Sequence, residues 1–126
     1  MNYLLDSSAW IEYFEGSLKG EKVSKILRSE KVYSVNLIIA EIVSKFKRKG
    51  MDFNQAYRVL LSNSVIVELT SEIAKEAGIL HADMKKKIKD FGLADAIILI
   101  SARKIKAKVV TGDKHFKSFK EVMWIG

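Results

Sequence analysis

Residues 93–113 of the chain read LADAIILISARKIKAKVVTGD. A helix over about residues 93–105 would be apolar on nearly every face, which predicts that it is deeply buried. The β-rich stretch at residues 108–111 predicts a strand that closes on Gly112 and Asp113. A buried helix next to a short apolar strand is typical of a sheet with helices on both faces.

The same alternation of short strands and helices runs through the rest of the chain. Further strands are predicted at residues 3–5, 32–35, 65–67 and 122–125. Ser7 or Ser8, Asn36, Asp52 and Thr70 can act as N-caps of helices, and Gly50 and Gly92 are expected to end two of them. This order predicts right-handed βαβ crossovers and an α/β sandwich with a mainly parallel sheet.

The composition of the chain excludes several classes of protein and of functional site. The 126 residues show no linker or change of composition, so we expect a single domain over 1–126. No apolar run approaches the roughly 20 residues of a membrane span, and Asp6 comes too early for a signal peptide, so a cytoplasmic protein is expected. The absence of cysteine excludes disulfides, thiolate zinc sites and cysteine nucleophiles. The net charge of +7 favours polyanionic partners.

Four carboxylates are expected to converge at the carboxyl edge of the sheet. Asp6 and Asp113 follow predicted strands. Glu41 lies little more than a turn into a helix that leaves a strand, and Asp95 lies in the first turn of the buried helix. Because the first turns of a helix entered from that edge stay near it, all four side chains can meet in the crevice beyond the strands.

Such a group of acids predicts a metal site. Partly buried carboxylates that lie close together repel one another unless a cation neutralises them, and a set of oxygen ligands suits Mg²⁺ or Mn²⁺. A divalent ion of this kind can polarise a phosphodiester and activate water, which points to phosphodiester hydrolysis. The hydroxyls of Ser7, Ser8 and Thr111 can bond the carboxylates or a phosphate. The alternative for Asp6 and Asp95 is an ordinary helix N-cap.

Several motifs resemble those of PIN-domain ribonucleases. They are Leu4-Leu5-Asp6-Ser7-Ser8, Ala40-Glu41, Leu93-Ala94-Asp95-Ala96 and Val109-Val110-Thr111-Gly112-Asp113, and they occur in order over nearly the whole chain. The resemblance implies a three-layer α/β/α fold with a five-stranded parallel sheet. It also implies endonuclease cleavage of RNA with Mg²⁺ or Mn²⁺, with catalytic acids at Asp6, Glu41, Asp95 and Asp113.

Small stand-alone members of this family are similar to the toxins of VapC type. That likeness implies a cognate antitoxin as partner, and a homodimer. Basic residues that could contact RNA are Lys45, Lys47, Arg48, Lys85 and Lys86, although a solvated helix end explains them equally well.

Two other functions fit parts of the pattern. A response-regulator receiver is also an acidic, Mg²⁺-binding α/β domain, but it needs a phosphoacceptor Asp after the third strand, where this chain has Glu68-Leu69-Thr70. A non-catalytic RNA-binding PIN module would keep the fold without the chemistry. The aromatic residues, including Phe91 and Trp124, are expected in the core, and His81 and His115 outside the acidic positions.

Overall fold

The computed structural model describes residues 1–126, which form five strands and six α-helices with one short 3₁₀-helix. In chain order these are β1 (Asn2–Leu5), α1 (Ser7–Glu15), α2 (Leu18–Ser29), β2 (Lys31–Val35), α3 (Asn36–Arg48), α4 (Phe53–Asn63), β3 (Val65–Val67), α5 (Ser71–Lys85), α6 (Leu93–Lys104), β4 (Ala107–Thr111), η1 (Lys114–Phe116) and β5 (Val122–Trp124). All five predicted strands are present, each within two residues of its expected bounds.

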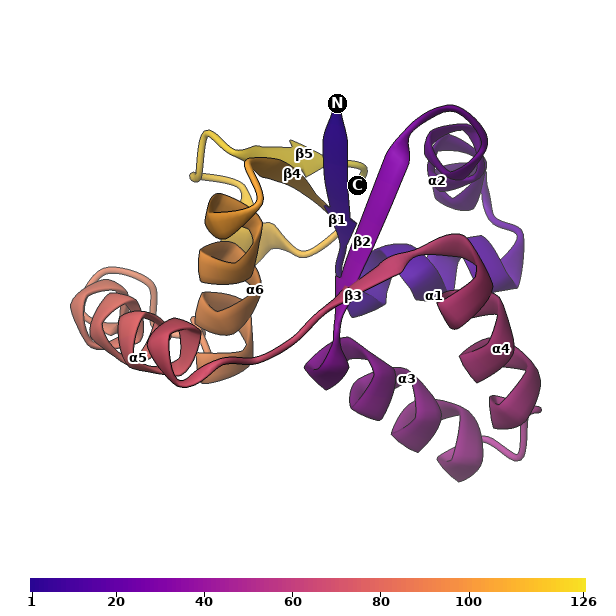
Figure 1. Cartoon of the computed structure of the whole chain (residues 1–126), viewed down its shortest axis with the longest axis horizontal. Coiled ribbons are helices and arrows are strands. Elements are labelled where there is room, and N and C mark those ends of the chain that lie inside the picture. The colour runs from indigo at the N-terminus through magenta and orange to yellow at the C-terminus, as the bar shows by residue number, and fades with distance from the viewer.

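The strands form one parallel sheet in the order β3-β2-β1-β4-β5. Helices α1 to α4 lie on one side of it and α5 and α6 on the other, as Figure 1 shows with the sheet between them. The predicted three-layer α/β/α sandwich is therefore confirmed, and its sheet is parallel throughout. No helix is both long enough and apolar enough to cross a membrane.

The sheet order contains a reversal beside β1. The chain moves outward from β1 through β2 to β3, then returns to place β4 on the other side of β1. In open α/β sheets, a crevice for ligands forms outside the carboxyl ends of the strands at such a switch point. The ends of β1 and β4 carry Asp6 and Asp113, so the topology sets these two acids beside the expected crevice.

The core joins the sheet to both helical layers. Twenty-seven apolar residues form one buried cluster, including Leu4 and Leu5 of β1 and Val109 and Val110 of β4. Helix α6 contributes six buried residues, which confirms its predicted burial. The prediction that Trp124 lies in the core is wrong. Trp124 is 37% exposed, and the Lys117 ammonium lies 4.1 Å from the centre of its ring.

Helix ends differ from the sequence prediction at three places. Asp6, and not Ser7 or Ser8, caps α1, since its carboxylate accepts from the amide of Ala9. Asn36 was predicted as an N-cap, but it is the first residue of α3. Its side chain accepts a hydrogen bond from the amide of Leu69 at 3.3 Å. Helix α5 ends at Lys85, so Gly92 does not end it but serves as the N-cap of α6. The predicted caps Asp52 and Thr70 are confirmed.

Candidate active site

Asp6 is the most buried of the four predicted acids, with 4% of its surface exposed. Its Oδ1 accepts hydrogen bonds from the Ser8 hydroxyl at 2.7 Å and the Ala9 amide at 3.0 Å, and its Oδ2 accepts from the Thr111 hydroxyl at 2.5 Å. Burial raises the pKa of Asp6 to about 6, although these three hydrogen bonds lower it, and the Asp113 carboxylate adds to the rise. Asp6 is thus both a helix cap and a desolvated acid.

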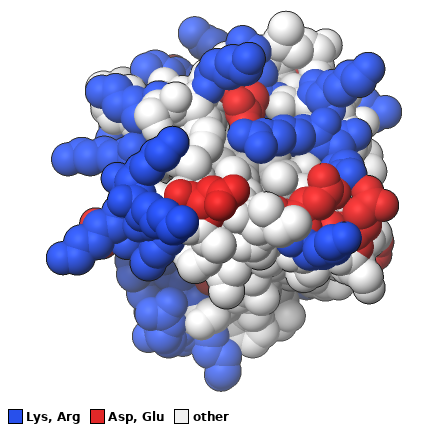
Figure 2. Space-filling view, turned by 90° about the vertical axis from the view of Figure 1, so that its left-hand side faces the viewer, with Lys and Arg blue, Asp and Glu red and all other residues white.

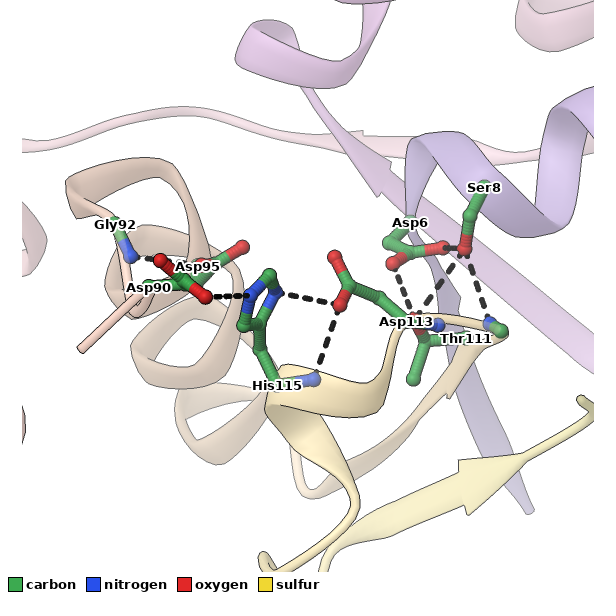
Figure 3. A network of polar contacts seen from close by, with 9 residues as sticks. Asp6, Ser8, Asp90, Gly92, Asp95, Thr111, Asp113 and His115 are labelled. Carbon is green, nitrogen blue, oxygen red and sulfur yellow. Dashed lines mark hydrogen bonds and ion pairs between the residues drawn. The ribbon is translucent and has the colours of Figure 1, made fainter. Parts of the chain in front are cut away.

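The hydroxyls around Asp6 connect the ends of β1 and β4. Leu5 pairs with Val110 across the two strands, which brings Asp6 beside Thr111. The Thr111 Oγ1 also accepts from the amide of Asp113 at 2.9 Å, and the Ser8 Oγ accepts from the amide of Gly112 at 3.0 Å. Figure 3 shows this network running from Ser8 through Thr111 towards Asp113. Ser8 and Thr111 therefore lie where sequence reasoning placed them, next to a carboxylate.

Glu41 lies in the second turn of α3, and it is only half-buried as a residue. Its Oε1 is inaccessible to solvent and has no hydrogen-bond partner. Burial raises the pKa of Glu41, and the carboxylates of Asp6 and Asp95 raise it further, while the Ser7 side chain lowers it. A buried carboxylate oxygen without a donor is costly, so this atom has an unmet need for a donor or a cation.

Asp95 lies in the first turn of α6, and its Oδ2 accepts from the amide of Gly92 at 2.8 Å. It therefore stabilises the start of that helix. This agrees in part with the alternative prediction that Asp95 is an N-cap, although the N-cap itself is Gly92. Burial raises the pKa of Asp95, against the Gly92 hydrogen bond, and the Asp113 carboxylate raises it again. The side chains of His115 and His81 lower it. Both histidines thus lie within electrostatic range of Asp95.

Asp113 caps the 3₁₀-helix η1 by accepting from the amide of His115 at 3.0 Å. The His115 ring lies between two carboxylates, with Nδ1 2.5 Å from Asp113 Oδ1 and Nε2 4.0 Å from Asp90 Oδ2 (Figure 3). Sequence reasoning expected His115 at a capped helix start, which is confirmed, but it missed the contacts of His115 with Asp113 and with Asp90. The spacing of His115, two residues after Asp113 on one tight turn, is the signal that could have found the first.

The oxygen atoms of these carboxylates are suitable ligands for a hard divalent cation, although the carboxylates do not surround a single position. Each of Asp6, Glu41 and Asp95 has its pKa raised by burial and by at least one neighbouring acid. No three Asp, Glu or His side chains lie close enough together to hold one ion between them. Mg²⁺ typically takes only one or two carboxylates directly and keeps several waters, so a closed group of three is not required.

The predicted basic residues do not form one surface. Lys45 and Arg48 line a cleft of about 610 Å³ that also contains Ser7, Ser8 and Glu41. Lys47 is on another side of α3, where its Nζ lies 5.6 Å from the centre of the Phe53 ring. Lys85 and Lys86 lie at the end of α5 in the opposite helical layer. Figure 2 looks onto the side of α5 and α6, where Lys and Arg side chains surround small groups of acids.

The family model for the PIN domain matches residues 3–122. The chain belongs to the PIN-domain family. The alternative of a receiver is therefore wrong, and the sheet agrees, because β3 lies at the edge here and not at the centre as in the receiver order 2-1-3-4-5. No curated protein matches the chain.

Solved structures share the fold of this PIN domain over almost its whole length. A toxin–antitoxin complex from Klebsiella pneumoniae has a TM-score of 0.81 and 22% identity, and the match covers 98% of each chain. VapBC2 from Rickettsia felis, bound to a promoter DNA fragment, has a TM-score of 0.74 and 19% identity, covering 98% of this chain and 97% of that one. VapC20 from Mycobacterium tuberculosis, a toxin that cleaves the sarcin–ricin loop, has a TM-score of 0.75 and 17% identity, covering 95% and 98%.

Proposed function

We propose that this PIN domain is a Mg²⁺- or Mn²⁺-dependent endoribonuclease, with Asp6, Glu41, Asp95 and Asp113 as its metal-binding and catalytic residues. The observation that carries the proposal is the burial of mutually repelling carboxylates at the switch point between β1 and β4. Buried like charges destabilise a fold, and a divalent cation removes that cost.

The residues of the chain hold this site in place before any ion binds. The hydroxyls of Ser8 and Thr111 fix the Asp6 carboxylate, and the Gly92 amide fixes Asp95. Glu41 brings an oxygen that has no protein donor. A bound divalent cation would neutralise the negative charge of these acids and would polarise the phosphodiester bond of a substrate.

We also propose that the protein is the toxin of a toxin–antitoxin pair, acting on cytoplasmic RNA and forming a homodimer. Support comes from the likeness in fold to chains of toxin–antitoxin complexes, among them those from Klebsiella pneumoniae and Rickettsia felis. A net charge of +7 suits an RNA substrate. An antitoxin would keep the nuclease inactive by covering the carboxylates.

A second candidate is a PIN module that binds RNA without cutting it. The observation in its favour is that no three acids are close enough to hold one ion together. Under this alternative, the basic residues would bind the RNA, and Asp6, Asp95 and Asp113 would only stabilise helix starts.

Cleavage of labelled RNA separates the two candidates. Wild-type protein is incubated with Mg²⁺, Mn²⁺ or EDTA and compared with Asp6→Asn and Asp95→Asn, both checked for folding by circular dichroism. The control is Asp83→Asn, which changes an exposed acid of α5. We expect metal-dependent cleavage that both site variants lose and the control keeps. Equal cleavage by all four proteins would refute the site, and RNA binding without cleavage would favour the non-catalytic module.

A further inference from the structure

Asp113 acts electrostatically on two other acids of the candidate site. Burial raises the pKa of both Asp6 and Asp95, and the charge of Asp113 raises the pKa of each of them further. The side chain of Asp113 is itself 35% exposed, so it is less enclosed by its neighbours than Asp6 is. The orientation of the Asp113 carboxylate therefore depends on its polar contacts.

His115 supplies both polar contacts of the Asp113 carboxylate, and both are made to the same oxygen. The backbone amide of His115 donates to Oδ1 at 3.0 Å, and the ring Nδ1 of His115 lies 2.5 Å from Oδ1. This Nδ1 is inaccessible to solvent and makes no hydrogen bond with any other group. The second oxygen of Asp113, Oδ2, has no hydrogen bond or ion pair, as Figure 3 shows. His115 thus restrains one oxygen of the carboxylate and leaves the other free.

The His115 ring also faces Asp90, but that contact is much weaker. Nε2 of the ring lies 4.0 Å from Asp90 Oδ2, which is beyond hydrogen-bond distance, and the Asp90 side chain is 79% exposed. An exposed pair of this kind contributes little. The contact with Asp113 is short, and its Nδ1 is shielded from solvent. The hydrogen that it needs on Nδ1 is present both in one neutral form of the ring and in the charged ring.

We propose that His115 is a positioning residue, which holds Oδ1 of Asp113 and leaves Oδ2 as the oxygen that Asp113 offers to the divalent cation. The inference rests on the proposed function, because it takes Asp113 as a ligand of that ion. A group that bonds a ligating carboxylate fixes the orientation of the ligand before the ion binds. Without the ring, the Asp113 side chain would lose this restraint, and binding of the ion would have to order it.

The test measures the affinity of the full chain for Mn²⁺, apart from any cleavage, by the electron paramagnetic resonance of the free ion. Wild type is compared with His115→Ala, His115→Asn and His115→Gln, which all keep the backbone amide that bonds Asp113. The asparagine amide nitrogen can take the place of Nδ1, whereas that of glutamine lies nearer the place of Nε2. The matched control is His81→Ala, because His81 acts electrostatically on Asp95 and makes no polar contact with Asp113. Circular dichroism and urea unfolding check the fold of each variant.

His115→Ala and His115→Gln should bind Mn²⁺ about 10- to 100-fold more weakly than wild type, and His115→Asn should recover most of the loss. Asp90→Asn should change the affinity by at most about fivefold, and His81→Ala should stay within the same range.

Two results would overturn the role of His115 and leave the metal site standing. One is wild-type affinity in folded His115→Ala, and the other is an equal loss in the alanine, asparagine and glutamine variants, which would show that the ring matters only for packing. A wild type that binds no Mn²⁺ would instead refute the proposed metal site, and the inference with it.

Discussion

Asp6 serves the fold and the proposed chemistry with the same carboxylate. Its Oδ1 caps α1 and its Oδ2 accepts from Thr111, yet its burial still disfavours the charged form. The hydrogen bonds only partly offset the loss of water. A residue that favours folding through its contacts and opposes folding through its charge is typical of functional sites.

This conflict predicts that Asp6→Asn stabilises the metal-free protein at high pH. The folded pKa is about 6 against an ordinary value of 3.8, so the contribution of protonated Asp6 is complete below about pH 4 and is lost as the pH rises through 6. Urea unfolding in EDTA at pH 8 should show the variant more stable by up to about 3 kcal/mol, with the difference gone at pH 4. Asp83→Asn should show no such pH dependence. A variant that loses stability at pH 8 would contradict the burial argument.

The sequence predicted positions for the acids and only some of their partners. Asp6 and Asp113 could be placed because they end strands, and Glu41 because it interrupts an apolar helix face. Ser8 and Thr111 could also be expected near a carboxylate. The contacts of His115 with Asp113 and Asp90 were not predicted, because they depend on the path of the turns after Lys85 and Thr111, which no periodic pattern describes.

At the scale of elements, the position of α1 depends on a close approach to α2. A Cβ added to Gly20 would lie 2.1 Å from the carbonyl oxygen of Glu12, so α2 packs against the α1 backbone where only a glycine fits. Helix α1 in turn carries Ser7 and Ser8 into the candidate site. Its packing therefore supports the geometry around Asp6.

Two alanine substitutions test this contact as a matched pair. Gly20→Ala forces α1 and α2 apart and should cost about 1–3 kcal/mol of unfolding free energy. Gly78→Ala, in α5, meets no atom within 4 Å and should stabilise the protein by roughly 0.5–1 kcal/mol, since alanine favours helix more than glycine does. Chemical denaturation of both measures the effects. Destabilisation of the two variants to the same degree would argue against a specific α1–α2 approach.

Strands and helix caps could be predicted from the sequence wherever they depend on residues that are close together in the chain. The strands came from short β-rich runs, and the caps Asp52 and Thr70 from their place before apolar helices. Asn36 was misassigned because its side chain accepts from Leu69, 33 residues away, which is a tertiary contact. Gly92 was expected both to end one helix and to precede the next, and only the second expectation is confirmed, because α5 already ends at Lys85.

At the scale of the whole molecule, the sheet reversal beside β1 brings the acids to one edge from four separate parts of the chain. Asp6 and Asp113 come from adjacent strand ends, Glu41 from the α1–α4 layer and Asp95 from the α5–α6 layer. The pKa values of Asp6, Glu41 and Asp95 are each raised by burial and by a neighbouring carboxylate, which is the physical basis for proposing a shared cation.

Titration with Mn²⁺, followed by the electron paramagnetic resonance of the free ion, tests that proposal most directly. The wild type should bind Mn²⁺ and lose it to EDTA, and Asp83→Asn should bind equally well. The double variant with Asp6→Asn and Asp95→Asn should bind at least about tenfold more weakly while remaining folded. Binding of Mn²⁺ to the folded double variant with wild-type affinity would contradict a metal site at these carboxylates.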